Sequence, residues 1–294
     1  MPTIVVRRGL LIVCTLFTFL ATMRAQTANC TFQPIPLPSN IIRFTPNGIN
    51  DYGNVVGTAD SKTATEHRGF IGYSDGIFKT FAFDGNPQTA FSKRNRLGVT
   101  VGYFQSPDLN FHGMVYKNGV ATKLDYPGAS ETYLTGINAS GTIVGYYFTT
   151  AGKLHGFAYA KGKFSQIGYP GKDFALPTAI NDNGAIVGTY EQLNSNGVHG
   201  FIRENGVFRS LDDPKSTGNT FPNDINNSGV VVGYYSAPGI VGGAFWYKDG
   251  AFKDIVMANA ASSYAFGINS QQQVTGYAYV KGQNTPVRYI ATCQ

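Results

Sequence analysis

The sequence is poor in charged residues and in tryptophan. Asp, Glu, Lys and Arg together make up 14% of its 294 residues, and there is one Trp. Half of the formal charge of +6 comes from three arginines within residues 1–25, and the basic residues Lys93, Arg94 and Arg96 form the only later cluster. Because nucleic-acid binding depends on extended basic surfaces, we expect no nucleic-acid partner.

The sequence also lacks strong helical periodicity and, after its first residues, long apolar runs. A helical bundle and a membrane span are therefore not expected. Arg7 and Arg8 precede an apolar run over residues 9–21, and Ala25 is a small residue suited to cleavage. This pattern predicts a signal peptide over residues 1–25 and a secreted, periplasmic or cell-surface bacterial protein. The arginine pair leaves twin-arginine export open beside the general route.

Glycine, by contrast, is abundant, and much of it belongs to a repeat. The segment G-I-N-A-S-G-T-I-V-G at residues 136–145 has close copies along the chain at steps of 43 or 45 residues. The repeated asparagines are Asn50, Asn95, Asn138, Asn181, Asn226 and Asn269. The glycines seven residues after them are Gly57, Gly102, Gly145, Gly188, Gly233 and Gly276. A period of this length is typical of four-stranded propeller blades.

One repeat contains four short segments rich in β-branched and aromatic residues. They cover residues 132–137, 142–148, 154–160 and 163–169, and turn residues separate them. A single sheet of this kind leaves two apolar faces exposed, so the six copies are expected to pack around a common axis. The predicted fold is all-β: a six-bladed β-propeller of four-stranded antiparallel blades, as one domain over residues 26–294.

The two ends of the chain are expected to share the last blade. Residues 31–38 align with residues 163–170, the fourth strand of a repeat, whereas the chain ends in the third strand of the sixth. The N-terminal strand therefore closes the last blade. This places Cys30 and Cys293 together and predicts a disulfide, with Cα atoms within about 7 Å.

The repeat I-N-x-x-G-x-I-V-G-Y followed by H-G-F resembles the bacterial extracellular HAF-repeat family over essentially the whole chain after residue 25. The corresponding tripeptides begin at His112, His155 and His199. The first copy reads His67-Arg68-Gly69-Phe70, and the last two replace His by Gly243 and Thr285. The resemblance implies a repeat fold and export but no particular reaction.

The four histidines do not predict a metal site. They occupy the same position in four different blades, so a ring would spread them too far apart for one ion. We expect each imidazole to bond within its own blade, and we expect no cofactor and no metal. Calcium binding by the acidic and Asn-rich loops stays open, although no D-x-D-x-D-G run occurs.

Candidate binding residues are positions at which one blade departs from the others. Lys93 and Asp224 replace small residues two positions before the repeated asparagine and would face each other in a six-blade ring. The position before them carries a mostly polar collar in which Phe266 is the exception, and Arg94 replaces a recurrent Ile. The candidates are Lys93, Arg94, Asp224, Asn47, Asn223 and Phe266. They either hold a polar ligand at the channel mouth or, as we favour for Lys93 and Asp224, satisfy one another.

The loops between the second and third strands vary in length, whereas the other hairpin turns are short. Variable loops on a rigid scaffold commonly carry binding. The leading hypothesis is an exported, monomeric, non-catalytic module that binds a polysaccharide, a cell-surface component or a protein on this face or at the channel mouth. The alternatives are a hydrolase or lyase with its site at the channel mouth, and a purely structural surface protein.

Overall fold

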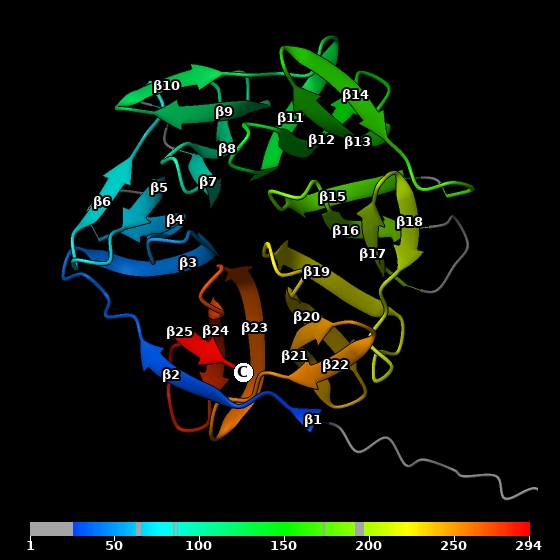
Figure 1. The fold of residues 1–294 in the computed structure, drawn as a ribbon. Helices are drawn as coiled ribbons and strands as arrows, with labels where there is room; N and C mark the ends of the chain where they lie inside the picture. The colour runs from blue at the N-terminus through cyan, green and yellow to red at the C-terminus, as the bar shows by residue number, and fades with distance from the viewer. Residues whose placement is uncertain (1–25, 63–65, 85, 87, 173, 192–196) are drawn as a thin grey trace, which may run out of the picture.

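The computed structural model confirms the predicted architecture. It describes residues 26–62, 66–84, 86, 88–172, 174–191 and 197–294. These residues form an all-β propeller of six antiparallel sheets around a central axis (Figure 1). The signal peptide predicted over residues 1–25 lies outside the described residues.

Each blade begins with its innermost strand and continues outward, so four strands in sequence order make one sheet. Blade 1 consists of β3 (Ile41–Ile49), β4 (Val55–Ser61), β5 (His67–Gly72) and β6 (Phe78–Phe81). Blade 2 consists of β7 (Thr89–Arg94), β8 (Thr100–Gln105), β9 (Phe111–Lys117) and β10 (Val120–Lys123). Blade 3 consists of β11 (Ala129–Ile137), β12 (Ile143–Thr149), β13 (Leu154–Ala160) and β14 (Lys163–Ile167).

The other three blades follow the same plan, with additions from the N-terminus. Blade 4 consists of β15 (Phe174–Ile180), β16 (Ile186–Glu191), β17 (His199–Glu204) and β18 (Val207–Ser210). Blade 5 consists of β19 (Asn219–Ile225), β20 (Val231–Ala237), β21 (Ile240–Lys248) and β22 (Ala251–Asp254). Blade 6 consists of β23 (Ala260–Ile268), β24 (Gln273–Val280), β25 (Val287–Cys293) and the N-terminal β2 (Cys30–Pro34). The strand β1 (Gln26–Thr27) pairs in parallel with β22, a fifth strand that the repeat does not predict.

One large side chain on the third strand of every blade is almost completely buried. These residues are Phe70, Met114, Phe157, Phe201, Phe245 and Tyr289. The first five follow the glycine of the H-G-F motif or its equivalent, which explains the recurrence of this tripeptide as a packing requirement. Each ring or thioether fills the space between adjacent sheets, where burying a side chain of this size stabilises the fold by roughly 2 to 3 kcal/mol.

The glycine seven residues after each repeated asparagine is required by a close backbone approach. A β-bulge in the first strand brings a carbonyl oxygen over the second strand. A Cβ atom on Gly145 would lie 2.1 Å from the carbonyl oxygen of Tyr133, and the equivalent distances in the other blades are 1.9 to 2.1 Å. No side chain fits at such a distance, so this glycine is part of the blade itself.

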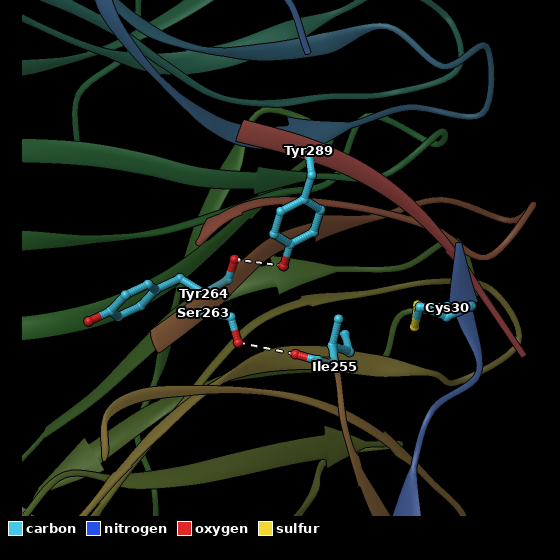
Figure 2. The surroundings of a disulfide bond; sticks show 6 residues. Cys30, Ile255, Ser263, Tyr264 and Tyr289 are labelled. Atoms are coloured by element: carbon cyan, nitrogen blue, oxygen red, sulfur yellow. Dashed lines mark hydrogen bonds between the residues drawn. A yellow bond between two sulfur atoms is a disulfide. The ribbon is translucent and has the colours of Figure 1, made fainter. Parts of the chain in front are cut away.

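The predicted disulfide closes the ring. Cys30 of β2 and Cys293 of β25 are bonded with their Cα atoms 4.1 Å apart, across 263 residues of sequence. The two strands pair in register from Cys30 opposite Cys293 to Pro34 opposite Tyr289. Figure 2 shows the surrounding polar contacts, in which the hydroxyl of Tyr289 donates to the carbonyl oxygen of Tyr264. The first and last strands are therefore joined covalently as well as by the sheet.

Candidate functional site

The central channel is crossed by an ion pair between opposite blades. Nζ of Lys93, in blade 2, lies 2.9 Å from Oδ2 of Asp224, in blade 5. The same Nζ donates to the backbone oxygens of Asn47, at 2.8 Å, and Phe266, at 2.5 Å. All three N–H bonds of the ammonium therefore have acceptors within the fold.

The carboxylate of Asp224 also has several partners within the fold. It accepts hydrogen bonds from the backbone N–H groups of Ile225 and Ile268 in addition to the ion pair. Burial raises the pKa of Asp224 and lowers that of Lys93, and the charge of each partner acts against these shifts. Because each N–H of the ammonium has an acceptor and the carboxylate already accepts three bonds, the geometry favours mutual satisfaction over ligand binding for this pair.

The polar collar next to this pair joins blades 1, 3, 4 and 5 to the blade that follows each of them. The amide groups of Asn47 and Asn223 donate to the backbone oxygens of Phe91 and Ala265 in the next blade. Thr135 and Thr178 bond the next blade in the same way. These contacts hold neighbouring blades together. The side-chain amides of Asn47 and Asn223 each use one N–H in such a bond.

Arg94 takes the place of an inter-blade Ile and folds back onto its own turn. Its Nη1 donates to the carbonyl oxygen of Gly98 and to Oγ1 of Thr100, while its buried Nε has no hydrogen-bond partner in the described part of the chain. Burial lowers the pKa of Arg94, opposed by the charges of Tyr73 and Tyr116. The guanidinium is therefore held at the turn by its own blade.

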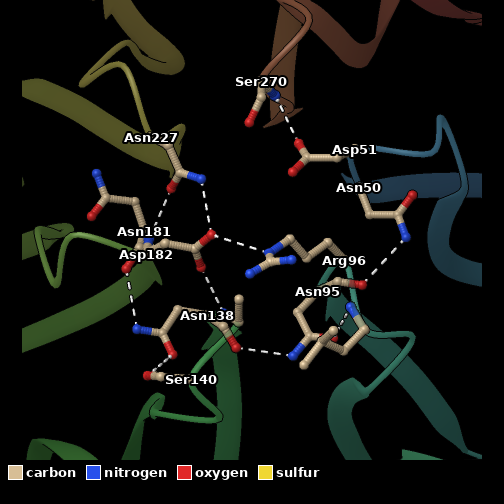
Figure 3. Close-up of polar contacts among 12 residues, drawn as sticks. Asn50, Asp51, Asn95, Arg96, Asn138, Ser140, Asn181, Asp182, Asn227 and Ser270 are labelled. Atoms are coloured by element: carbon tan, nitrogen blue, oxygen red, sulfur yellow. Dashed lines mark hydrogen bonds and ion pairs between the residues drawn. The ribbon is translucent and has the colours of Figure 1, made fainter.

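The repeated asparagines form a closed ring of hydrogen bonds at one end of the channel. Each side-chain amide donates to the backbone oxygen of the equivalent asparagine in the next blade, from Asn50 to Asn95 and onward until Asn269 returns to Asn50. Figure 3 shows the part of this ring from Asn50 through Asn95 and Asn138 to Asn181. Each side-chain oxygen meanwhile accepts from its own turn, as in the bond from the N–H of Thr142 to Asn138. The asparagine thus links neighbouring blades and shapes the first hairpin.

A shallow recess of about 80 Å³ lies over this ring. The residues after the asparagines surround it, and Figure 3 shows Arg96 reaching toward Asp182, with Nε 3.8 Å from Oδ2. Asp182 also accepts from the N–H of Ala139 and the amide of Asn227, while Asp51 accepts from the N–H of Ser270. The acidic groups at this end are already bonded between blades.

The histidines bond within their own blades, as expected. His67, His112 and His199 place Nδ1 against the carboxylates of Asp60, Asp125 and Asp212, and His155 contacts Gln166. Within the described residues, no three His, Cys, Asp or Glu side chains converge where they could hold a metal ion.

One short segment has the spacing of a serine-hydrolase nucleophile motif. It is Gly72-Tyr73-Ser74-Asp75-Gly76, which runs from the last residue of β5 into the turn before β6. The backbone closes a hairpin turn there, with the N–H of Tyr73 donating to the carbonyl oxygen of Ile77. A nucleophile elbow requires a strand-to-helix turn, so this segment is a blade turn and not a catalytic motif.

The opposite end of the propeller, which carries the variable loops, has two clefts on either side of blade 1. The cleft between blades 6 and 1, called the 6–1 cleft, has a volume of about 250 Å³. It is lined by Arg43, Phe44, Thr45, Thr58, Asp60, His67, Tyr277, Tyr279, Pro286 and Arg288. The cleft between blades 1 and 2, called the 1–2 cleft, has a volume of about 200 Å³. It is lined by Thr58, His67, Gln88, Thr89, Ala90, Tyr103 and Phe111.

Each cleft continues into a group of incompletely buried aromatic rings. The 1–2 cleft joins a group in blades 2 and 3: Tyr103, Phe111, Tyr133, Tyr146 and Phe148. The 6–1 cleft joins a group in blades 5 and 6: Phe221, Tyr234, Tyr264, Phe266, Tyr277 and Tyr279. Because Thr58 and His67 line both clefts, the clefts and ring groups form a continuous surface, here called the aromatic band.

The rings of the aromatic band contact one another but keep accessible surface. Tyr133 lies 5.0 Å from Tyr103 and 4.7 Å from Tyr146 between ring centres, and Tyr279 is 48% exposed. Burial raises the pKa of Tyr146 and raises that of Tyr277 to about 12, so these phenols stay neutral and keep their O–H donors. Several of these tyrosines occupy equivalent positions in different blades, and the packing of the neighbouring blades decides which of their faces are accessible.

No protein-family model matches the chain, and no curated protein matches it. Solved structures resemble it in fold. TolB from Acinetobacter baumannii is similar with a TM-score of 0.51 and 9% identity, over 83% of this chain and 64% of that protein. The propeller domain of the trilobed protease from Pyrococcus furiosus is similar with a TM-score of 0.46 and 11% identity, over 84% of this chain and 98% of that domain. A gluconolactonase from Xanthomonas campestris is similar with a TM-score of 0.49 and 12% identity, over 92% of this chain and 98% of that protein.

These similarities show the class of fold, a β-propeller, and their low identities carry nothing about activity. Among the described residues, no helix has the length and apolar character to cross a membrane.

Proposed function

We propose that the protein is an exported, non-catalytic module that binds a polysaccharide on the aromatic band. The observation that carries this proposal is the continuity of two aromatic groups through two clefts that share Thr58 and His67. Sugar rings present flat C–H faces that pack on aromatic rings and hydroxyl groups that bond their polar edges. Tyrosine supplies both kinds of contact.

Export is supported by the disulfide between Cys30 and Cys293, since such bonds persist in oxidising compartments. The leader pattern over residues 1–25 and the resemblance to the HAF-repeat family point the same way. A monomer is the proposed state, because each blade has neighbours on both sides and the ring closes on itself.

The contacts at the channel argue against the enzymatic alternative. That alternative would place its chemistry on Lys93, Arg94 and Asp224. Lys93 and Asp224 are engaged by their ion pair and by backbone atoms, and Nη1 of Arg94 is held by Gly98 and Thr100. General acid–base catalysis requires a group that can reach a substrate. Lys93, Arg94 and Asp224 line the recess over the asparagine ring, but the ion pair and the hydrogen bonds of Arg94 hold them within the fold.

The test is a binding screen of the purified protein against a panel of soluble polysaccharides, with Tyr103→Ala and Tyr277→Ala beside the parent. Each variant removes one ring from one side of the aromatic band, and we expect roughly a 10-fold loss of affinity for the polysaccharides that bind. Tyr52→Ala is the matched control, because Tyr52 is 68% exposed in a turn at the opposite end.

Each polysaccharide that binds is then incubated with the protein and examined for released sugars. The proposal expects binding without products. It is overturned if nothing in the panel binds, or if both band variants bind as tightly as Tyr52→Ala. Released sugars would favour the hydrolase or lyase alternative.

A further inference from the structure

We propose that the 6–1 cleft selects an acidic sugar, with a carboxylate of the uronic-acid type as the group recognised. This inference rests on the proposed function and names its ligand class. It comes from a charge imbalance: the cleft contains two guanidinium groups and one carboxylate, and that carboxylate is already bonded twice.

Arg288 is positioned in the 6–1 cleft by neutral partners. Its Nε donates to the carbonyl oxygen of Phe44 at 2.9 Å, and its Nη1 donates to that of Pro286 at 2.8 Å. The guanidinium centre lies 5.4 Å from the centre of the Phe44 ring. Neither an ion pair of Arg288 nor a hydrogen bond of its Nη2 is found with the described part of the chain. The group is therefore fixed in place and keeps donor capacity.

The one carboxylate in the cleft, that of Asp60, serves other groups. Its Oδ2 lies 2.5 Å from Nε of Arg43, and its Oδ1 lies 2.5 Å from Nδ1 of His67. With both oxygens occupied, Asp60 neutralises one of the two arginines, so the cleft retains a positive charge.

Burial lowers the pKa of Arg288, Tyr279 and Tyr277 oppose this shift, and the nearby charge of Arg43 acts in the same direction as burial. Arg288 is thus a partly buried cation beside a second cation, with no ion pair to a carboxylate in the described part of the chain. A planar guanidinium matches the two oxygens of a carboxylate, and charge-assisted bonds of this kind are about twice as strong as neutral ones. A bound carboxylate would supply the missing countercharge.

The 1–2 cleft provides an internal contrast. Its lining, as far as the structure describes the chain, contains no Lys, Arg, Asp or Glu, and its polar groups are Thr, Gln, His and Tyr side chains. Such a lining suits an uncharged sugar. The two clefts therefore differ in charge although they share Thr58 and His67. This arrangement fits an acidic sugar in the 6–1 cleft and an uncharged sugar in the 1–2 cleft.

The experiment compares alginate, polygalacturonate and hyaluronate with their carboxyl-reduced forms, which keep the sugar backbone and lose the charge. We expect at least one acidic polymer to bind roughly 10-fold more tightly than its reduced form, and added salt to weaken that preference. Arg288→Gln is expected to remove most of the preference for the acidic polymer over its reduced form.

Two further variants keep the test decisive if Arg288→Gln unfolds. Arg43→Gln changes a largely exposed side chain and is expected to weaken the binding of acidic polymers several-fold. Asp60→Asn removes the competing carboxylate and is expected to tighten their binding. Arg203→Gln is the control, since Arg203 lies in blade 4 over the ring of Phe208.

The inference is overturned if all three acidic polymers bind no better than their reduced forms, or if Arg43→Gln and Asp60→Asn behave like Arg203→Gln. In those cases the proposed function still stands when Tyr277→Ala weakens binding, and it fails when no polymer binds at all. A sulfated neutral polysaccharide that binds through Arg43 and Arg288 while all three carboxylated polymers fail would overturn the carboxylate assignment in favour of a sulfate ester.

Discussion

The ammonium of Lys93 and the carboxylate of Asp224 lie 2.9 Å apart across the centre of the ring, and both side chains are buried. They come from blades 2 and 5, which face each other. The acceptors of Lys93 and the donors to Asp224 include backbone groups of blades 1 and 6. One ion pair thus ties together four of the six blades at the axis.

Removing one member of this pair should be more damaging than removing both. Asp224→Leu leaves the ammonium of Lys93 buried without its countercharge, and we expect a loss of about 3 to 5 kcal/mol in the free energy of unfolding. The double variant Lys93→Met, Asp224→Leu should lose clearly less. Chemical denaturation measures both, with the exposed Arg96→Gln as a control expected to change stability by less than about 1 kcal/mol. Equal losses in the single and double variants would contradict the assignment.

A second prediction concerns the repeated glycine. In Gly145→Ala the new methyl group would lie 2.1 Å from the carbonyl oxygen of Tyr133, so the first two strands of blade 3 must separate. We expect a loss of about 3 kcal/mol or more in the free energy of unfolding. Gly168→Ala is the control, because no atom lies within 4 Å of its Cβ position and its φ is not positive. Comparable denaturation midpoints for the two variants would show that the close approach is not what fixes this glycine.

The disulfide should contribute strongly, because it closes most of the chain into one loop. On the loop-entropy account, a closure across 263 residues stabilises by about 5 kcal/mol before any strain is subtracted. We expect the double variant Cys30→Ser, Cys293→Ser to unfold at a lower denaturant concentration than the oxidised parent. The parent treated with a reducing agent should match the variant, whose own unfolding should not respond to the reagent. An oxidised parent no more stable than the variant would refute the prediction.

The repeat was sufficient to predict the number of blades, their strands and the closure of the last blade. Each depends on spacing along the chain: the interval between Asn50 and Asn95 is one blade, and the alignment of residues 31–38 identifies the closing strand. The pairing of Cys30 with Cys293 followed from that alignment. The facing positions of Lys93 and Asp224 followed from blade number alone.

The aromatic band could not be predicted in the same way. Tyr103 and Tyr277 occupy equivalent positions in blades 2 and 6. A sequence repeat predicts the same environment for side chains at equivalent positions. Whether such a ring is covered depends on its neighbours in the next blade, which differ around the ring. Blade 1 has Thr58 at this position, so space remains beside it for the two clefts. The parallel pairing of β1 with β22 also escaped prediction, because Gln26 and Thr27 precede the first repeat.

A final prediction concerns a buried carboxyl group outside the aromatic band. Asp213 is 3% exposed; its Oδ1 accepts from the N–H of Lys215, and its Oδ2 has no partner in the described part of the chain. Burial raises the pKa of Asp213 above its ordinary value of 3.8, while the bond from Lys215 opposes the shift. The folded protein therefore holds this proton more tightly than the unfolded chain does, and stability is lost as the pH rises and the group ionises.

Asp213→Asn removes that ionisation and keeps an acceptor for Lys215. We expect the variant to be more stable than the parent at pH 7 by roughly 1 kcal/mol, because the amide carries no charge that burial would desolvate. The advantage should shrink as the pH falls and be absent below about 3.8, where the parent carboxyl is neutral in both states. Denaturation across this pH range measures the effect, with the exposed turn residue Asp249 changed to Asn as the control. A constant difference at every pH would mean that the ionisation of Asp213 is not its cause.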